Sequence, residues 1–370
     1  MTFESYSLDP AILSALHQMG YEKPTIIQER AIPLILEGKD LIALAETGSG
    51  KTAACAIPIC SRISTQLNHI QALIIVPTRE LALQYATEAQ KIGRIKGVRA
   101  FALFGGEDMA MQRAKLNNGV HVLVATPGRL IDFVYRQVID LSHVSTLILD
   151  EADQMLSLGF YEDLDFIMNC LVQKHQILLF SATMPAAIKK IAQGHMNNPE
   201  EVMLIGNKPA PTKLSLEFVY CKNPHAKKEQ LLDLLHNIKC DQCLIFGNAR
   251  HEVEKLYYQL KPHFHPIDYL HGGLSQPTRT SIIGKFARGK TKYLVASDVA
   301  SRGLDFSQVS HVINLHFPLD QETYLHRAGR TGRLGESGIC ITLVTKRELP
   351  RMEKMLKTLS REPRWIGNAP

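Results

Sequence analysis

The segment that decides the fold is Ala45-Glu46-Thr47-Gly48-Ser49-Gly50-Lys51-Thr52, which follows an apolar run at residues 40–45 and opens an apolar helical pattern at 53–59. Glycines here let the chain approach a bound group closely, and the first N–H groups of the helix point toward that group with the positive end of the helix dipole. Lys51 is placed to reach the β- and γ-phosphates of a nucleotide, and the Thr52 hydroxyl can ligate Mg²⁺. The general pattern begins with Gly where this chain has Ala45, but the strand before it and the Lys51-Thr52 pair match. The segment is therefore predicted to be a phosphate-binding loop between a strand and a helix.

Short apolar runs rich in β-branched residues alternate with helical patterns along the whole chain. This alternation is typical of parallel sheets covered by helices. The runs form two series separated by Gly206-Asn207-Lys208-Pro209-Ala210-Pro211-Thr212, whose two prolines suit neither a helix nor an inner strand. We expect an α/β fold with domains at 1–205 and 213–370 and a linker at 206–212, the halves being alike in architecture rather than in sequence. The expected strands are 40–45, 73–76, 121–125, 147–149 and 177–180 in the first half, and 214–220, 243–246, 293–296, 311–314 and 338–344 in the second.

The composition predicts a folded, soluble protein. Of the 370 residues, 45% are hydrophobic and 21% charged, as in chains that bury substantial cores. No apolar run reaches the roughly 18 residues of a membrane span, and seven irregularly spaced cysteines fit a reducing compartment, so we expect a cytoplasmic protein, and a monomer. Charge is uneven: 17 basic minus 21 acidic residues give −4 before Gly206, and 25 minus 15 give +10 from Gly206 onward. Such a basic half attracts polyanions, although a merely solvated surface can carry the same charge.

Three acids end the apolar strand expected at 147–149. Asp150 can hold Mg²⁺, and Glu151 is close enough in sequence to orient and deprotonate an attacking water. An acid at a strand end can also simply cap the next helix. The phosphate-binding loop earlier in the chain favours the catalytic interpretation.

The string Asp150-Glu151-Ala152-Asp153, about a hundred residues after that loop, resembles the DEAD-box helicases of superfamily 2, whose core is two tandem RecA-like domains. The resemblance extends from Phe3 to about Leu343, because the other family motifs follow in order. Residues 20–28 look like the adenine-recognising Q motif, which implies that Gln28 reads the edge of adenine; an amide offers the donor and acceptor this needs, and Tyr21 or Phe3 can stack on the base. By resemblance, the nucleotide contacts are Phe3, Tyr21, Lys23, Thr25, Gln28, Thr47, Gly48, Ser49, Gly50, Lys51, Thr52, Gly303 and Asp305.

Other strings resemble the family's RNA-gripping motifs, although each also has the composition of an ordinary strand-to-helix turn. Helix N-termini, exposed N–H groups and arginines suit phosphates and 2′-hydroxyls, so the implied grip does not depend on base sequence. At Ser297 the family usually has Thr, a change that keeps the hydroxyl. The implied RNA contacts are Pro77, Thr78, Arg79, Gly105, Gly106, Thr126, Pro127, Gly128 and Arg129 in the first half, and Arg250, His271, Gly272, Gln276, Arg279 and Ser297 in the second.

Residues 324–333 place three arginines at a spacing of three, which predicts that they lie along one side of a helix that runs into a glycine-rich stop. A solvated basic helix is the alternative interpretation. By resemblance, Arg330 and Arg333 are arginine fingers that reach the γ-phosphate. The residues implied to couple ATP to RNA are Asp153, Ser181, Thr183, Arg302, His326 and Arg327, of which the last two would tie this motif to the first domain's acids and to the neighbourhood of Arg302.

The resemblance implies an RNA-stimulated ATPase that uses ATP and Mg²⁺, with Lys51, Asp150, Glu151, Arg330 and Arg333 as catalytic residues. ATP and RNA would together favour closure of the two domains, with local, non-processive unwinding or remodelling of RNA–protein complexes. One alternative is an ATP-gated RNA clamp or assembly scaffold with little unwinding, and another is a DNA helicase of a neighbouring group. A zinc site at Cys240 and Cys243 is not expected, because no second pair of ligands accompanies them.

Overall fold

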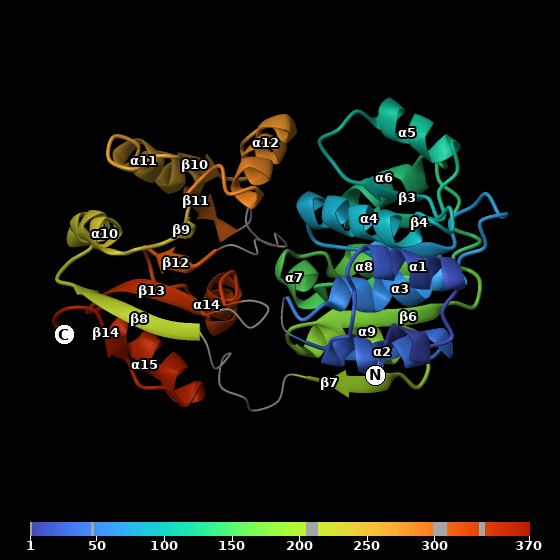
Figure 1. The fold of residues 1–370 in the computed structure, drawn as a ribbon, viewed down its shortest axis with the longest axis horizontal. Helices are drawn as coiled ribbons and strands as arrows, with labels where there is room; N and C mark the ends of the chain where they lie inside the picture. The colour runs from blue at the N-terminus through green and yellow to red at the C-terminus, as the bar shows by residue number, and fades with distance from the viewer. Residues whose placement is uncertain (1, 46–47, 205–213, 299–308, 333–336) are drawn as a thin grey trace. The chain divides into compact units, whose positions relative to one another are not determined.

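The computed structural model describes residues 2–45, 48–204, 214–298, 309–332 and 337–370. The chain divides into two compact units, Met1–Gly206 and Asn207–Pro370, which we call unit 1 and unit 2. The linker expected at 206–212 lies outside the described residues. Each unit contains one seven-stranded sheet (Figure 1).

The strands are short, as parallel strands between helices usually are. In unit 1 they are β1 (Leu41–Leu44), β2 (Ala72–Ile75), β3 (Ala100–Leu103), β4 (Val122–Ala125), β5 (Thr146–Leu149), β6 (Gln176–Ser181) and β7 (Glu200–Met203). In unit 2 they are β8 (Leu214–Cys221), β9 (Cys243–Gly247), β10 (Ile267–Leu270), β11 (Tyr293–Ser297), β12 (His311–Asn314), β13 (Gly338–Thr345) and β14 (Arg364–Trp365).

The two sheets have the same topology. Unit 1 has the order β3-β4-β2-β5-β6-β1-β7, and unit 2 has β10-β11-β9-β12-β13-β8-β14. Counted along the chain, both orders are third, fourth, second, fifth, sixth, first, seventh. Every pair of neighbouring strands is parallel. The halves are thus alike in architecture, as the sequence predicted.

Helices connect successive strands, and several begin at a side chain that caps their free N–H groups, among them Asp9, Thr78, Asp108, Ser275 and Asp320. Unit 1 has the 3₁₀ turn η1 (Phe3–Ser5) and the helices α1 (Pro10–Gln18), α2 (Ile26–Leu36), α3 (Lys51–Arg62), α4 (Arg79–Gly93), α5 (Met109–Asn117), α6 (Pro127–Tyr135), α7 (Ala152–Ser157), α8 (Tyr161–Asn169) and α9 (Ala186–His195). Unit 2 has α10 (Ala226–Asn237), α11 (Arg250–Leu260), α12 (Gln276–Ala287), α14 (Gln321–Ala328) and α15 (Leu349–Thr358).

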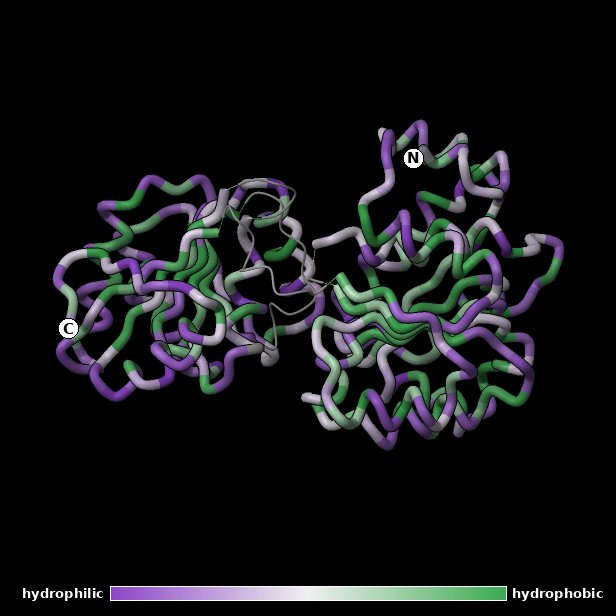
Figure 2. The backbone as a smooth tube through the Cα atoms, turned by 90° about the horizontal axis from the view of Figure 1, so that it is seen from below, coloured by the Kyte–Doolittle hydropathy of each residue, from purple (hydrophilic) through white to green (hydrophobic). Residues whose placement is uncertain are grey.

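Helices cover both faces of each sheet, so each sheet has a core on either side. Successive side chains of a strand point to opposite faces and so enter different cores. On β2 of unit 1, Ile74 packs in the core with α1 to α4, whereas Leu73 and Ile75 pack in the core with α6 to α9. On β9 of unit 2, Phe246 faces α12, α14 and α15, and Ile245 faces α10 and α11. Figure 2 shows the result as a bundle of hydrophobic strands inside each unit.

The sequence prediction found the inner strands and missed the outer ones. The four strands that it missed, β3, β7, β10 and β14, are the edge strands of the two sheets. Edge strands pair on one side only and can be less buried: in β7 only Val202 is buried, and in β3 two of the four residues are only partly buried. None of the described helices has the length and apolar composition that crossing a bilayer requires.

Candidate active site

The predicted phosphate-binding loop connects β1 to α3. Gly48 and Gly50 have φ angles of 82° and 96°, a left-handed conformation that favours glycine. Lys51 is the first residue of α3, is only 6% exposed, and donates from Nζ to the carbonyl oxygen of Ala45 at 2.7 Å. The ammonium is therefore held across the mouth of the loop, where the sequence predicts phosphates. Thr47 lies outside the described residues.

The Q-motif residues bond directly to this loop. Gln28 Oε1 accepts a hydrogen bond from the Thr25 N–H at 2.9 Å, and Gln28 Nε2 donates to the Gly50 carbonyl at 3.2 Å. The Thr25 hydroxyl donates to the Ser49 carbonyl at 2.9 Å. Thr25 and Gln28 also form a capping box at the start of α2, whose Thr-x-x-Gln signature sequence reasoning missed. The start of α2 and the phosphate-binding loop are thus one hydrogen-bonded assembly.

The aromatic residues predicted to stack on the base lie beside one another. Phe3 is 2% exposed and contacts Tyr21 edge-on, with 6.0 Å between ring centroids. The Tyr21 hydroxyl donates to Glu88 Oε1 at 2.7 Å, and burial together with that carboxylate raises the pKa of Tyr21. Phe3 therefore supports Tyr21 from within the core, whereas Lys23 is exposed.

The acids follow β5, which is separated from β1 only by β6; two strand spacings are roughly 10 Å. Asp150 is 3% exposed, and burial raises its pKa to about 6 although Lys51 acts to lower it. Glu151 has φ 52° and is the residue before α7, but its side chain makes no capping hydrogen bond, so the helix-cap interpretation is not met at this residue. Its Oε2 is buried without a hydrogen-bond partner among the residues that the structure describes. Burial disfavours the ionised form of Asp150, and the next residue, Glu151, has the oxygen without a partner. Two such neighbouring carboxylates fit a site for a hard cation such as Mg²⁺.

Asp153 joins α7 to the segment after β6. Its Oδ2 accepts three hydrogen bonds, from the N–H of Ala182 at 3.0 Å, the N–H of Thr183 at 2.8 Å and the hydroxyl of Thr183 at 3.0 Å. The Asp153 N–H donates to the Ser181 hydroxyl at 3.3 Å. The contact between these hydroxyls and Asp153 that the sequence analysis expected is therefore present inside unit 1.

The predicted nucleotide residues and the predicted RNA residues follow different strands at the carboxyl end of the sheet. Parallel strands end at the same edge, so the segments that follow neighbouring strands lie near one another. Residues 77–79 follow β2, residues 105–106 follow β3 and residues 126–129 follow β4, and these three strands are neighbours. The phosphate-binding loop and residues 150–153 and 181–183 follow β1, β5 and β6, which are also neighbours.

The arginines at the RNA part of this edge have defined positions. The Arg79 guanidinium packs on Gly106. A Cβ at position 106 would lie 2.2 Å from Arg79 Nη1, so a side chain there would displace the guanidinium from this position. Arg129 donates to Gln112 Oε1 at 2.7 Å and to the Glu107 carbonyl at 3.2 Å. Thr78 caps α4, with its hydroxyl accepting from the Leu81 N–H. Sequence analysis did not single out Gln112, because its partner is 17 residues away.

Unit 2 places its predicted RNA residues on the corresponding strands. Residues 271–272 follow β10, Ser297 ends β11 and Arg250 follows β9, and these strands are again the first three of the sheet. His271 Nε2 lies 2.8 Å from Glu254 Oε1, and Arg279 donates to the His271 carbonyl at 3.4 Å. Arg250 pairs with Glu254 at 3.3 Å. Gln276 is the first residue of α12.

The expected helix with three arginines is shorter than predicted. Helix α14 ends at Ala328, because Gly329 terminates it, so Arg327 is on the helix and Arg330 is beyond it. Arg333 lies outside the described residues, as do Arg302, Gly303 and Asp305. A spacing of three does not ensure a continuous helix where glycine follows.

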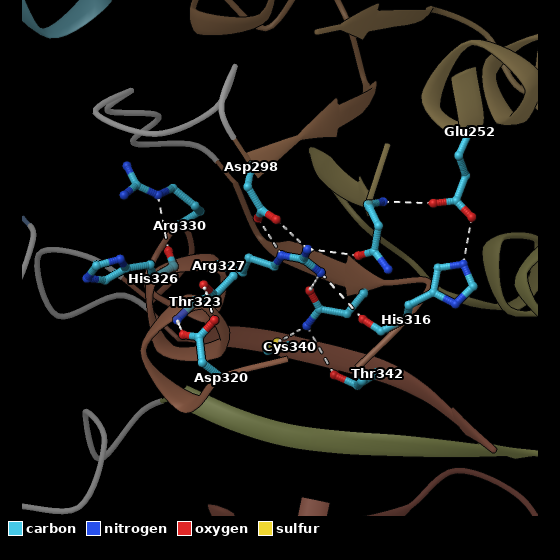
Figure 3. Close-up of polar contacts among 12 residues, drawn as sticks. Glu252, Asp298, His316, Asp320, Thr323, His326, Arg327, Arg330, Cys340 and Thr342 are labelled. Atoms are coloured by element: carbon cyan, nitrogen blue, oxygen red, sulfur yellow. Dashed lines mark hydrogen bonds and ion pairs between the residues drawn. The ribbon is translucent and has the colours of Figure 1, made fainter. Parts of the chain in front are cut away.

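Arg327 is the centre of a polar cluster (Figure 3). Its Nε and Nη2 donate to the two carboxylate oxygens of Asp298 at 2.6 Å each. Nη1 donates to Asn314 Oδ1 at 3.2 Å, and Nη2 donates to Asn248 Oδ1 at 3.2 Å. All these partners belong to unit 2. Arg302 lies outside the described residues, so the expected tie to its neighbourhood and to the first domain's acids stays a prediction; the sequence analysis assigned no role to the two asparagines.

Arg330 follows directly from this cluster. Its N–H donates to the Arg327 carbonyl at 3.0 Å, and its Nε donates to the His326 carbonyl at 3.2 Å (Figure 3). Arg330 is 3% exposed, and the imidazole of His326 is half-buried. The backbone of Arg327 thus fixes the start of the segment that carries the predicted fingers.

Known protein families match both units of the chain. The family described as DEAD/DEAH box helicase matches residues 25–191, and the helicase conserved C-terminal domain matches residues 226–335. The DEAD-box ATP-dependent RNA helicase CshA of Geobacillus kaustophilus is 41% identical over 362 residues, which are 98% of this chain and 77% of that protein. CshA of Bacillus subtilis is 40% identical over 363 residues, 98% of this chain and 73% of that protein.

A solved structure of S. cerevisiae Dbp5 bound to RNA and ADP BeF3 is similar with a TM-score of 0.91 and 30% identity, covering 99% of this chain and 95% of that one. The two parallel seven-stranded sheets are accordingly tandem RecA-like domains, which confirms the predicted fold class. The chain therefore belongs to the DEAD-box ATP-dependent RNA helicases, enzymes that hydrolyse ATP and act on RNA.

Proposed function

We propose that the chain couples ATP hydrolysis to closure of its two domains, 1–205 and 213–370, and that closure opens short RNA duplexes or remodels RNA–protein complexes locally. The observation that carries the proposal is the division of one sheet edge in unit 1, where nucleotide residues follow β5, β6 and β1 and RNA residues follow β3, β4 and β2. In unit 2 the predicted RNA residues likewise follow the first three strands of the sheet, β10, β11 and β9. Two such edges suit one nucleotide and one RNA strand held side by side.

In this proposal, the nucleotide is held mainly by unit 1. Gln28 reads the adenine edge, Tyr21 packs against the base, and the N–H groups at 48–52 and Lys51 bind the phosphates. Glu151 orients the attacking water and takes its proton, and its Oε2, which has no hydrogen-bond partner within the described parts of the chain, is available for this bond. Arg330 and Arg333 of unit 2 stabilise the charge that develops on the γ-phosphate.

Asp150 and Thr52 are the residues that would hold Mg²⁺. Their oxygen atoms suit this cation, which commonly retains waters and phosphate oxygens as its other ligands. When bound, Mg²⁺ neutralises charge on the β- and γ-phosphates. Lys51 acts on the same phosphates and on Asp150, whose ionised form it favours.

Coupling between ATP and RNA is proposed to pass through Asp153. Three hydrogen bonds to its Oδ2 connect the acids after β5 to the segment after β6. A shift of α7 on ATP binding or hydrolysis therefore moves residues 181–183. If ATP and RNA both favour the closed form, each raises the affinity for the other by linkage.

RNA is proposed to be gripped by its backbone, independent of base sequence, because the predicted contacts are helix starts, glycines and arginines. The +10 charge from Gly206 onward favours a polyanion. We further propose that the protein acts as a monomer in the cytoplasm.

The test is a duplex-release assay run beside an ATPase assay on the full chain, with RNA or DNA as stimulant. We expect RNA-stimulated turnover with strand release, loss of nucleotide binding in Lys51→Ala, and turnover lowered by roughly 10³ to 10⁵ in Arg330→Ala. ATP-dependent retention of RNA without strand release would instead favour the clamp, and equal stimulation by DNA would contradict RNA specificity. Normal turnover in Lys51→Ala would refute the proposed site.

A further inference from the structure

Glu252 lies in the first turn of α11, two residues after the predicted RNA contact Arg250; it has no assigned role itself, and it bonds to two segments that contact Arg327. Its Oε2 accepts from the Asn248 N–H at 2.7 Å, and its Oε1 lies 2.7 Å from His316 Nε2 (Figure 3). Asn248 follows β9 and His316 follows β12. One carboxylate therefore bridges the ends of two neighbouring strands.

The surroundings of His316 fix which ring nitrogen carries the proton. Lys227 Nζ lies 3.5 Å from His316 Nδ1, and an ammonium group can only donate. Glu252 is a carboxylate, which only accepts, so its 2.7 Å contact places a hydrogen on Nε2, and Nδ1 is left facing Lys227. Lys227 is itself buried and bonds to both oxygens of Glu348, at 2.9 and 2.8 Å. A continuous chain of polar contacts thus anchors Glu252 to the start of α15.

Glu252 is well suited to remain charged in this position. Burial opposes its ionisation, but the bonds from His316 and the Asn248 N–H outweigh burial and lower the pKa of Glu252 to about 2. Both of its partners are hydrogen-bond donors, so a carboxylate, which only accepts, satisfies them together.

The two segments that Glu252 holds also provide acceptors for Arg327. Asn248 Oδ1 accepts from Arg327 Nη2 at 3.2 Å, and the His316 carbonyl accepts from Arg327 Nη1 at 3.4 Å. The Arg330 N–H in turn donates to the Arg327 carbonyl at 3.0 Å. The path from Glu252 to Arg330 is therefore made entirely of direct hydrogen bonds and the backbone.

We propose that Glu252, acting through Asn248 and His316, is a positioning residue that orients Arg327 and, through it, the finger Arg330. The inference rests on the proposed function, because it requires that Arg330 acts on the γ-phosphate. Glu252 itself touches neither nucleotide nor RNA in this scheme. Its removal should lower the rate of chemistry rather than weaken the binding of ATP, whose proposed contacts are mainly in unit 1.

The first test is Glu252→Gln in the full chain, assayed for RNA-stimulated ATP hydrolysis. Glutamine keeps the volume but has one acceptor for two donors, so one contact is lost. We expect kcat to fall by about tenfold to a hundredfold, as for catalytic groups displaced by about an ångström, and KM for ATP to change by less than about twofold. Glu229→Gln, which removes an exposed carboxylate from the same unit, is the matched control and should match the parent. Equal kcat in the two variants would overturn the proposal.

A second test uses His316, where a conservative variant distinguishes positioning from general loss of structure. Glutamine can donate to Glu252 and accept from Lys227, as the imidazole does, whereas leucine can do neither. We expect His316→Gln to retain most of kcat and His316→Leu to lose as much as Glu252→Gln. Circular dichroism at the assay temperature confirms folding, and equal kcat in the two His316 variants would contradict the proposed path.

Two further variants separate this inference from the proposed function. Asn248→Ala combined with Glu252→Gln should lower kcat by less than the product of the two single effects, because the two changes share the contact through Asn248; fully multiplied effects would refute the path through Asn248. Arg330→Ala, measured alongside, should lose turnover. If it retains turnover, the proposed function fails; if it loses turnover and Glu252→Gln does not, only the positioning role fails.

Discussion

Thr183→Val removes one hydroxyl from the junction between β6 and α7. Asp153 Oδ2 accepts bonds from the Ala182 N–H, the Thr183 N–H and the Thr183 hydroxyl. Valine keeps the branched shape and both backbone donors, so only the 3.0 Å hydroxyl bond is lost. A hydrogen bond to a charged group contributes about 1.5 to 3 kcal/mol. We therefore expect the free energy of unfolding to fall by about 2 kcal/mol, measured by urea denaturation.

The same change should affect coupling more than hydrolysis. The phosphate-binding loop and Asp150 are untouched, so ATP turnover at saturating RNA should be near that of the parent, while fewer strands are released per ATP consumed. Thr183→Ser keeps the hydroxyl and is the control, expected to behave as the parent in both assays. If the valine and serine variants have the same unfolding free energy and the same strands released per ATP, the bond to Asp153 neither stabilises nor couples.

Three further changes test other parts of the chain. Lys227→Met should cost about 3 to 5 kcal/mol of stability, because the buried Glu348 is left without its cation, and adding Glu348→Gln should recover part of this loss in urea unfolding; fully additive effects in the double variant would refute the pairing. Asp150 holds its proton up to about pH 6 when folded but only to about 3.9 when unfolded, so stability should fall as pH rises through that window, by up to about 3 kcal/mol. Asp150→Asn in metal-free, nucleotide-free protein should consequently be more stable than the parent at pH 7.5 but not at pH 4, and an equal gap at both pH values would contradict this. Gly50→Ala should cost about 1 to 2 kcal/mol because φ is 96°, and unchanged unfolding would mean that the loop relaxes freely.

The inner strands were predictable because burial on both faces leaves a continuous apolar run, as in Ala72–Ile75, where every residue is buried. The edge strand Glu200–Met203 was not, because three of its four residues are exposed. Its place depends on pairing with β1, which no local pattern encodes.

The site was predictable where chemistry is local in sequence. Lys51 and Thr52 are neighbours in one loop, and Asp150 to Asp153 form one string, so their residue types could be assigned to the fold before the structure. Partners brought together by topology could not: Glu252 and His316 are 64 residues apart, and Gln112 meets Arg129 only because of the sheet order. The spacing of the three arginines led to a wrong helix length. The local period of three continues past Gly329, the residue at which α14 ends.

The hydrogen bond from the Gln28 amide to the Gly50 carbonyl has a consequence for nucleotide selection. A Cβ on Gly50 would lie 2.8 Å from Gln28 Nε2, so the two groups have little freedom to move independently. In the proposed site, where Gln28 reads adenine, a base with another edge, such as guanine, that turned this amide would also disturb the backbone at Gly50, which the proposal places against the triphosphate. Discrimination among nucleotides should then lower kcat. Triphosphates with a mismatched base should be hydrolysed slowly even at concentrations that fill the site.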